Sequence, residues 1–521
     1  MKPCLLNKSQ DFGFDATLPP GHQDLIQDLE LSTLLRAMAA GDDYLLDVCR
    51  KVLLAGLHEP GAIRFRQQVL ADCLAHPAPV RAAYDVAAAA LRDKRRLWSG
   101  YGGSYQNPAS NLSGAVGHLE SFATRLRQLR QMADDHAGKF RSAGLTTLFA
   151  TLRRELDDEY FGQISEHLKQ LRFGHGVLIS AELDPDNSSS RLVLRDPGTI
   201  QRGWKERLGL GPRNRYSFSL EARDETGSQI LEDLTSRGVN LVANAAAQSA
   251  DHIGSYFTML RAELGFYVGC LNLAGQLTER GIPVAFPDPE PLAPPGPPRF
   301  SCTDLRDVSL ALQAPGPVIG NDVPGDGKPL VIITGANSGG KSTFLRSAGQ
   351  AQLMMQCGLF VTAQSYRASI ARAVFTHFIR DEDAEMTSGR LDEELRRMST
   401  IADRIQPGSL LLFNESFAGT NEREGAEIGR QIVSALLEAG IRVLFVTHRF
   451  GLAEHFRDHR TDETLFLRAE REPGGRRSYK LAVTEPLPTS YGEDLYYQHG
   501  RWLGETALSL AAGDEVDQGT L

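Results

Sequence analysis

The chain has 521 residues, of which 41% are hydrophobic and 23% charged, and its formal net charge is −9. This composition is typical of a globular protein of two to four domains, and it excludes a disordered or fibrous chain. A negative net charge provides no overall attraction for nucleic acid, so such a contact would need a local basic patch.

The cysteines and the N-terminus bear on the cellular compartment. The six cysteines are scattered and form no Cys-x-x-Cys pair, which argues against a disulfide framework and against a zinc site. The first eight residues lack the apolar core of a signal peptide, and no apolar run approaches the ~18 residues of a membrane span. We therefore expect a soluble, cytoplasmic protein without a membrane partner.

The first half of the chain shows helical periodicity. Apolar residues recur every three or four positions over 116–129, 145–171 and 253–271, which is the period of an amphipathic helix. The third helix is expected to begin near Gln229, with Gly238 and Gly254 weakening it. Three helices of this length predict an elongated all-α arm.

A small β module is predicted between the second and third helical patterns. The period changes to two over 177–183, 191–194 and 216–220. The module encloses five basic residues around Trp204, namely Arg202, Lys205, Arg207, Arg213 and Arg215. These residues form either a solvated loop or a tip that contacts the phosphate backbone of DNA, and the sequence leaves both readings open.

The chain changes character at a proline-rich stretch over 283–298, which forbids helix and favours an extended connector. Beyond it strands alternate with helices: strand 330–333, a helix over 343–355, strand 410–413, helix 423–439 and strand 442–446. This order predicts a mainly parallel sheet wrapped by helices.

Strand 330–333 leads directly into the phosphate-binding pattern Gly-x-x-x-x-Gly-Lys-Ser. In this pattern the glycines let backbone N–H groups surround the phosphates, the lysine reaches the β and γ oxygens, and the serine hydroxyl binds Mg²⁺. The following helix points its positive end at the anion. We therefore expect ATP and Mg²⁺ as cofactors, bound by Gly335, Ala336, Asn337, Ser338, Gly339, Gly340, Lys341, Ser342 and Thr343.

Strand 410–413 ends in Asn414 and Glu415, where phosphate-loop ATPases usually carry two acids. Glu415 is expected to orient the attacking water. Asn414 stands at the metal position and offers an oxygen without negative charge, so we expect slow hydrolysis or weak Mg²⁺ dependence. His448 ends the next strand at the sheet edge where ligands bind, and we interpret it as a sensor of the γ-phosphate rather than a structural histidine.

Seven motifs over 300–495 resemble those of the MutS family of DNA mismatch-repair ATPases. Besides the phosphate loop with its Asn337, residues 317–323 resemble the segment near the adenine, which implies nucleotide contacts from Ile319 and Asn321. Residues 358–363 resemble the strand after the loop helix, and 387–390 the signature loop that completes the partner's site, through Ser388, Gly389 and Arg390. Residues 414–425 resemble the acidic motif and dimer loop, 447–448 the switch histidine, and 488–492 a C-terminal tag.

The resemblance implies a fold of several domains. These are a helical core and first lever (1–171), a β clamp-like insertion (172–228), a returning lever helix (229–282), a linker (283–299), an α/β P-loop ATPase domain of ABC type (300–495) and a tail (496–521). It also implies a homodimer that binds DNA structure-selectively, mainly through the backbone, in repair or recombination, with downstream repair proteins as partners.

The chain departs from the family pattern at three places. No N-terminal mismatch-reading domain is expected ahead of the core-like segment 63–70, and the only Phe-x-Glu is Phe413-Asn414-Glu415. The signature loop continues with Leu391-Asp392 in place of Ser-Thr. Two alternatives therefore stay open: a nucleotide-binding switch or scaffold with little hydrolysis, and a transporter-type ATPase, which the missing Leu-Ser-Gly-Gly-Gln signature disfavours.

Overall fold

The computed structural model describes residues 1–15, 17–100, 107–173, 176–185, 189–195, 219–221, 223–291, 297–380, 389–471 and 477–487. Contacts divide the chain into two compact units: Met1–Phe12 with Ala75–Leu264, and Gly13–Leu74 with Gly265–Leu521. The expected basic tip over 202–215, Ser388 and the segment 488–492 lie outside the described residues.

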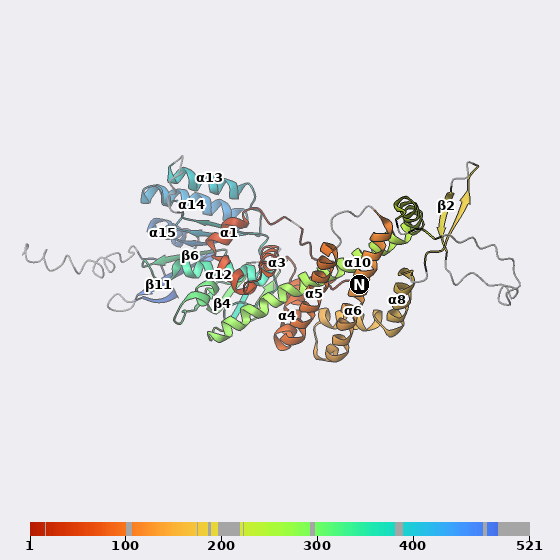
Figure 1. Ribbon diagram of the computed structural model, residues 1–521. Helices are drawn as coiled ribbons and strands as arrows, with labels where there is room; N and C mark the ends of the chain where they lie inside the picture. The colour runs from red at the N-terminus through yellow and green to blue at the C-terminus, as the bar shows by residue number, and fades with distance from the viewer. Residues whose placement is uncertain are drawn as a thin grey trace, which may run out of the picture. The chain divides into compact units, whose positions relative to one another are not determined.

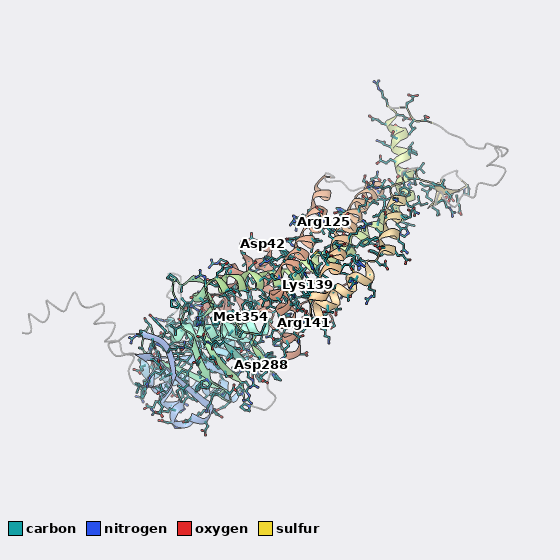
Figure 2. The ribbon with its side chains drawn as sticks, turned by 90° about the horizontal axis from the view of Figure 1, so that it is seen from below. Asp42, Arg125, Lys139, Arg141, Asp288 and Met354 are labelled. Atoms are coloured by element: carbon teal, nitrogen blue, oxygen red, sulfur yellow. The ribbon has the colours of Figure 1, made fainter. Side chains whose placement is uncertain are left out.

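The first unit consists of helices and one small antiparallel strand pair (Figure 1). Its elements are α5 (Pro77–Gly100), α6 (Pro108–His136), η1 (Ala137–Lys139), α7 (Ala143–Glu155), α8 (Asp158–Leu171), β1 (Ile179–Leu183), β2 (Ser189–Leu194) and most of α10 (Glu225–Glu279). Apolar side chains of α6, α8 and α10, among them Val116, Leu168 and Ala243, form one core. Arg125 of α6, labelled in Figure 2, forms an ion pair with Asp93 of α5 (Nη2–Oδ2 2.6 Å).

The helical half differs from the prediction in two respects. The pattern over 145–171 forms two helices, because the chain leaves helical geometry at Leu156 and Asp157 then caps α8 by accepting a hydrogen bond from Tyr160 N (2.8 Å). The third helix begins at Glu225 and continues through Gly238, where a Cβ would lie only 2.3 Å from Ile179 Cδ1. Glycine there permits close packing. The third predicted strand, over 216–220, falls largely outside the described residues.

The N-terminal segment Met1–Phe12 is held against α10 by a buried carboxylate. Glu263 is 0% exposed, and it accepts a hydrogen bond from Leu5 N (2.6 Å). Burial raises the pKa of Glu263 to about 7, although hydrogen bonds from the backbone of Leu5, Leu6 and Phe12 act in the opposite direction. The contact between Met1–Phe12 and α10 therefore encloses a buried ionisable group, Glu263, in the first unit.

The second unit combines N-terminal helices with two sheets. Its N-terminal helices are α1 (His22–Asp28), α2 (Leu31–Ala39), α3 (Asp43–Leu54) and α4 (Pro60–Ala75). The elements after α10 are β3 (Asp288–Glu290), β4 (Phe300–Leu305), α11 (Val308–Gln313), β5 (Asn321–Pro324), β6 (Leu330–Gly335), α12 (Lys341–Gln356), β7 (Ser365–Ser369), β8 (Val374–Phe378), α13 (Arg390–Ala402), β9 (Leu410–Asn414), α14 (Glu422–Glu438), β10 (Arg442–Val446), α15 (Phe450–His459), η3 (Thr461–Glu463), β11 (Thr464–Arg471) and β12 (Arg477–Val483).

The larger sheet has six strands in the order β12-β11-β6-β10-β9-β8, and every neighbouring pair is parallel except β11 with β12. Alternate side chains face opposite ways. On one face of the sheet, Phe413 and other buried strand residues pack with Met398 of α13, Val433 of α14 and Phe456 of α15. On the opposite face, Leu412 lies against Gly349 of α12. Figure 1 shows α12 on one side of the strands and α13 and α14 on the other. The predicted parallel sheet wrapped by helices is confirmed.

The smaller sheet, in the order β3-β7-β4-β5, was not predicted. Its edge strand β3 lies inside the stretch expected to be a linker and pairs with β7, since an edge strand tolerates proline. Arg64 of α4 pairs with Asp288 of β3 (Nη2–Oδ1 2.9 Å). The two compact units divide the N-terminal part of the chain after Phe12 and after Leu74, whereas the sequence predicted one helical domain over 1–171.

The strand expected over 358–363 is also displaced along the chain. Within that segment only Val361 pairs, in an isolated bridge with Ala285. The strand itself is β7, which begins at Ser365.

The cysteines are free thiols, and five of the six are buried. Four of them lie in the second unit: Cys49, Cys73 and Cys270 in α3, α4 and α10, and Cys357 directly after α12. Burial raises the pKa of each of these thiols. Neutral thiols are poor nucleophiles, so the folded second unit keeps them unreactive.

Candidate functional site

The loop between β6 and α12 has the backbone that its glycines allow. Gly335 and Gly340 have φ of +107° and +90°, a region that side chains disfavour. A Cβ on Gly335 would also lie 2.8 Å from Ala469 N of the neighbouring strand β11. These constraints explain why this turn needs glycine at both positions.

Lys341, at the start of α12, is a buried cation, and none of the described carboxylates accepts a hydrogen bond from it. Its Nζ donates to Gly335 O (3.0 Å) and Ala336 O (2.8 Å) of its own loop. Burial lowers the pKa of Lys341 to about 8, while Glu415 opposes that change. A phosphate group would supply the negative charge that this buried ammonium group needs, so the loop fits an anion.

Ser342 and Asn414, both expected at the metal, are in direct contact. The hydroxyl of Ser342, in the first turn of α12, donates to Oδ1 of Asn414, the last residue of β9 (2.8 Å). Both are oxygen donors of the kind that Mg²⁺ accepts. Among the described residues, no three His, Cys, Asp or Glu side chains gather as a metal site. A magnesium ion here would therefore be held by Ser342, Asn414 and the phosphates.

Glu415 and His448, from the segments that follow β9 and β10, also meet. His448 Nε2 lies 2.7 Å from Glu415 Oε1. This hydrogen bond is the main cause that lowers the pKa of Glu415, followed in the same direction by the charges of His448 and Lys341. Glu415 is therefore held as a carboxylate, the form able to accept a proton from water.

These side chains border a pocket of about 640 Å³. Asn337, Ser338, Gly339, Gly340, Lys341, Ser342, Thr343, Ile319, Asn321, Glu415 and His448 are among its lining residues, while Gly335 and Ala336 contribute their carbonyl oxygens to Lys341. Apolar atoms of Leu305, Leu310, Pro317 and Val318 line it as well. The pocket thus offers an anion-binding loop and an apolar region, as a nucleotide requires.

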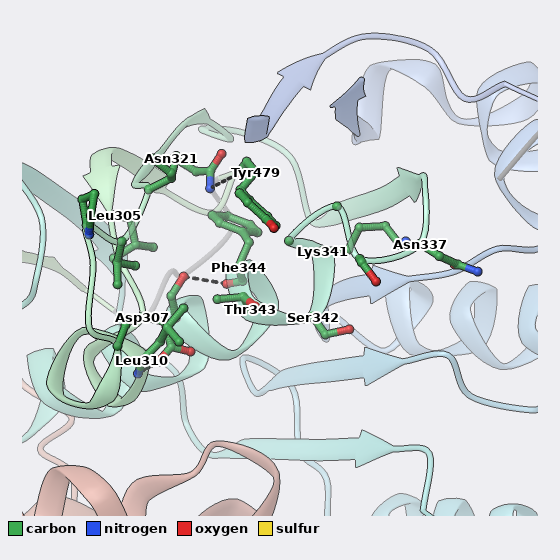
Figure 3. A pocket seen from close by; sticks show the side chains of 18 of the residues that line it. Leu305, Asp307, Leu310, Asn321, Asn337, Lys341, Ser342, Thr343, Phe344 and Tyr479 are labelled. Atoms are coloured by element: carbon green, nitrogen blue, oxygen red, sulfur yellow. Dashed lines mark hydrogen bonds between the residues drawn. The ribbon is translucent and has the colours of Figure 1, made fainter. Parts of the chain in front are cut away.

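Tyr479 is a lining residue that the sequence analysis missed. It projects from β12 and is 50% exposed. The side chain of Asn321 bonds the backbone beside it: Nδ2 donates to Tyr479 O (3.2 Å) and Oδ1 accepts from Leu481 N (2.7 Å). In the view of Figure 3, Tyr479 lies between Asn321, to its left, and Lys341 and Asn337, to its right. Asn321 therefore orients β12, and no local motif around Tyr479 signals its place.

The described part of the signature loop lies against the loop that follows β9. Gly389 precedes α13, and Arg390 Nε lies 3.8 Å from Glu394 Oε1 within that helix. A Cβ on Gly419 would lie 2.6 Å from Leu391 N, so the loop after β9 packs closely on the first turn of α13. Neither Gly389 nor Arg390 is among the residues that line the described pocket.

The glycine-rich turn into α12 and the polar groups that follow β9 and β10 thus gather at the carboxyl edge of the parallel sheet, where open α/β sheets bind their ligands. Two family models match the chain: "MutS2 N-terminal domain" over residues 58–280 and "MutS domain V" over residues 331–494. The chain belongs to the MutS family.

Similar curated proteins support this assignment. Endonuclease MutS2 of Lacticaseibacillus casei is 36% identical over 146 residues, which cover 28% of this chain and 19% of that protein. MutS protein homolog 4 of Mus musculus is 34% identical over 137 residues, covering 26% and 14%. DNA mismatch repair protein MutS of Chloroflexus aurantiacus is 31% identical over 186 residues, covering 32% and 19%. The chain thus spans about a fifth or less of the length of these relatives.

No helix among the described residues is both long and apolar enough to cross a bilayer.

Proposed function

We propose that this chain is an ATP-dependent DNA-binding protein of the MutS type, which couples ATP binding and hydrolysis at a dimer interface to DNA binding in repair or recombination. The observation that carries the proposal is the meeting of Lys341, Ser342, Glu415 and His448 at one pocket. Two relatives of the chain, a DNA mismatch repair protein and an endonuclease, support a role on DNA.

Each of these side chains has a task in that reaction. Lys341 would bind the β and γ phosphates, and Ser342 with Asn414 would hold Mg²⁺, which neutralises charge on the phosphates when bound. Glu415 would orient water and accept its proton, while His448 fixes the carboxylate (2.7 Å) and senses the γ-phosphate. The apolar part of the pocket, with Tyr479 beside it, would receive the base.

The dimer and the DNA contacts rest on the resemblance to the family. The signature loop Ser388-Gly389-Arg390 would complete the nucleotide site of the partner subunit. The basic residues from Arg202 to Arg215 would contact the DNA backbone, which carries no sequence information, so binding should be structure-selective and sensitive to salt.

The test is steady-state ATP hydrolysis without DNA and with homoduplex, mismatched or branched DNA, at low and moderate salt. Stimulation by one class of DNA would support the proposal and identify the substrate. Glu415→Gln should abolish turnover and preserve ATP binding, whereas Glu438→Gln, which removes an exposed acid at the far end of α14, should change neither. Turnover that no DNA alters would contradict the coupling to DNA.

A second candidate is a nucleotide-binding switch or scaffold that scarcely hydrolyses ATP and recruits protein partners. The observation in its favour is Asn414, whose neutral amide accepts from Ser342 (2.8 Å) where a carboxylate would give Mg²⁺ a negative ligand. Tight ATP binding without turnover under every condition would select this function.

A further inference from the structure

The loop that joins β9 to α14 carries Glu415 at its first position, and we call residues 415–421 the Glu415 loop. Two of its non-glycine residues, Glu415 and Phe417, have φ of +54° and +64°. Side chains other than glycine rarely adopt this left-handed backbone, and it persists only where the surroundings impose it. The contacts that impose it therefore decide where the Glu415 carboxylate lies.

His377, at the end of β8, holds the loop from one side. The ring is 0% exposed, with Nε2 2.9 Å from Glu394 O and Nδ1 2.7 Å from the Ser416 hydroxyl. Burial lowers the pKa of His377 to about 4, so the ring is neutral. Since the Glu394 carbonyl can only accept, Nε2 carries the single proton, and Nδ1 lies beside the Ser416 hydroxyl, which donates to His377 O (2.6 Å). The loop is thereby linked to α13, which carries Glu394.

Arg449, directly after His448, holds the loop from the other side. Nη1 donates to Asn421 O (2.8 Å) and Glu422 O (2.9 Å), and Nη2 donates to Phe417 O (2.6 Å) and Thr420 O (3.3 Å). One guanidinium group therefore binds three carbonyls of the Glu415 loop and the first carbonyl of α14. Of these, Asn421 O also accepts the first helical bond, from Gly425 N (3.0 Å). The planar fork of donors of the guanidinium group suits this task, which a lysine ammonium group cannot reproduce.

The sequence makes room for this guanidinium group. A Cβ on Gly425 of α14 would lie 2.4 Å from Arg449 Cζ, so glycine there admits the group. Burial lowers the pKa of Arg449, and the carboxylates of Glu422 and Glu394 act against that change. The side chain thus stays a cation beside two acids and four carbonyls.

We propose that Arg449 is a positioning residue for ATP hydrolysis: its four carbonyl contacts fix the Glu415 loop in the left-handed conformation that holds the Glu415 carboxylate against His448. This inference rests on the proposed ATPase function. Arg449 acts through the loop and is not among the residues that line the described pocket. Its loss should impair the chemical step and leave nucleotide binding intact.

The experiment compares the full-length protein with Arg449→Ala, Arg449→Lys and a matched control, Arg457→Ala. Arg457 is an arginine of α15 that pairs with Asp458 next to it (Nε–Oδ1 2.8 Å). Each variant is tested for ATP turnover, for the Kd of a fluorescent ATP analogue, and for turnover with added guanidinium at non-denaturing concentration. Arg449→Ala should lower kcat about 10- to 100-fold, leave Kd unchanged, and recover part of its turnover with guanidinium. The lysine in Arg449→Lys should restore little of the turnover that Arg449→Ala loses, and the control Arg457→Ala should match the unmodified protein.

The outcomes separate the two proposals. If the unmodified protein binds ATP without turnover, the proposed ATPase function fails, and this inference falls with it. If the unmodified protein turns over ATP and both Arg449 variants match it, only the positioning role is overturned. Should Arg449→Ala not fold, Arg449→Lys decides the question: a lowered kcat at constant Kd supports the role, and parallel losses of kcat and ATP affinity overturn it.

Discussion

Glu263 gives the first unit a pH-dependent attachment of its N-terminal segment. The pKa of this carboxyl is raised from 4.5 to about 7 by burial. Below pH 4.5 the group is protonated whether the segment is closed or open. As the pH rises towards 7, the open state loses its proton first, so the closed state becomes less favourable. The free energy that favours the closed state over the open state falls by about 3 kcal/mol, at about 1.4 kcal/mol per pKa unit, and this fall levels off above pH 7.

Hydrogen exchange of peptides from Met1–Phe12 measures this opening directly. Between pH 4.5 and pH 8, and after correction for intrinsic rates, protection in the unmodified protein should fall about 150-fold relative to Glu263→Gln, whose side chain does not titrate. Glu232→Gln removes an exposed carboxyl of the same helix, so it should follow the unmodified protein. An equal pH dependence in the unmodified protein and Glu263→Gln would refute the reasoning.

Three further predictions concern the nucleotide site and the helical half. Asn414→Asp adds a negative ligand, so it should tighten Mg²⁺ activation and raise turnover several-fold; unchanged Mg²⁺ titrations of ATPase activity would contradict our reading of Asn414. Because the pKa of Lys341 is about 8 and only its charged form attracts phosphate, ATP affinity should fall about tenfold per pH unit above 8. A fluorescence titration showing constant affinity from pH 7 to 9.5 would be incompatible with that account. Asp157→Ala removes the cap of α8 and should lower the free energy of unfolding by about 1 kcal/mol in urea denaturation, with the neighbouring Asp158→Ala costing less; equal effects would count against the cap.

The sequence predicted the larger sheet and the phosphate loop because their signals are local. Residues 330–333 and 410–413 are continuous apolar runs, and both became buried central strands. The spacing from Gly335 to Ser342 then required a strand before it and a helix after it. Ser342, Asn414, Glu415 and His448 converge because parallel strands deliver their carboxyl ends to one edge of the sheet.

The smaller sheet and two contributors to the site could not be predicted in this way. Strands β3 and β5 are short and polar, and their pairing depends on contacts between distant parts of the chain. Tyr479 reaches the pocket only because β12 pairs antiparallel with β11 and because Asn321 holds its backbone. Arg449 resembles any surface arginine until the four carbonyls around it are seen.

The buried cysteines make this chain convenient for spectroscopy. Five of its six thiols are buried, and burial also raises the pKa of the partly exposed Cys4. Thiol reagents attack the thiolate, so the folded chain should label slowly at neutral pH. A single cysteine introduced at an exposed position could therefore carry a fluorophore without removal of the native ones. Labelling of the native thiols would then report opening of the second unit.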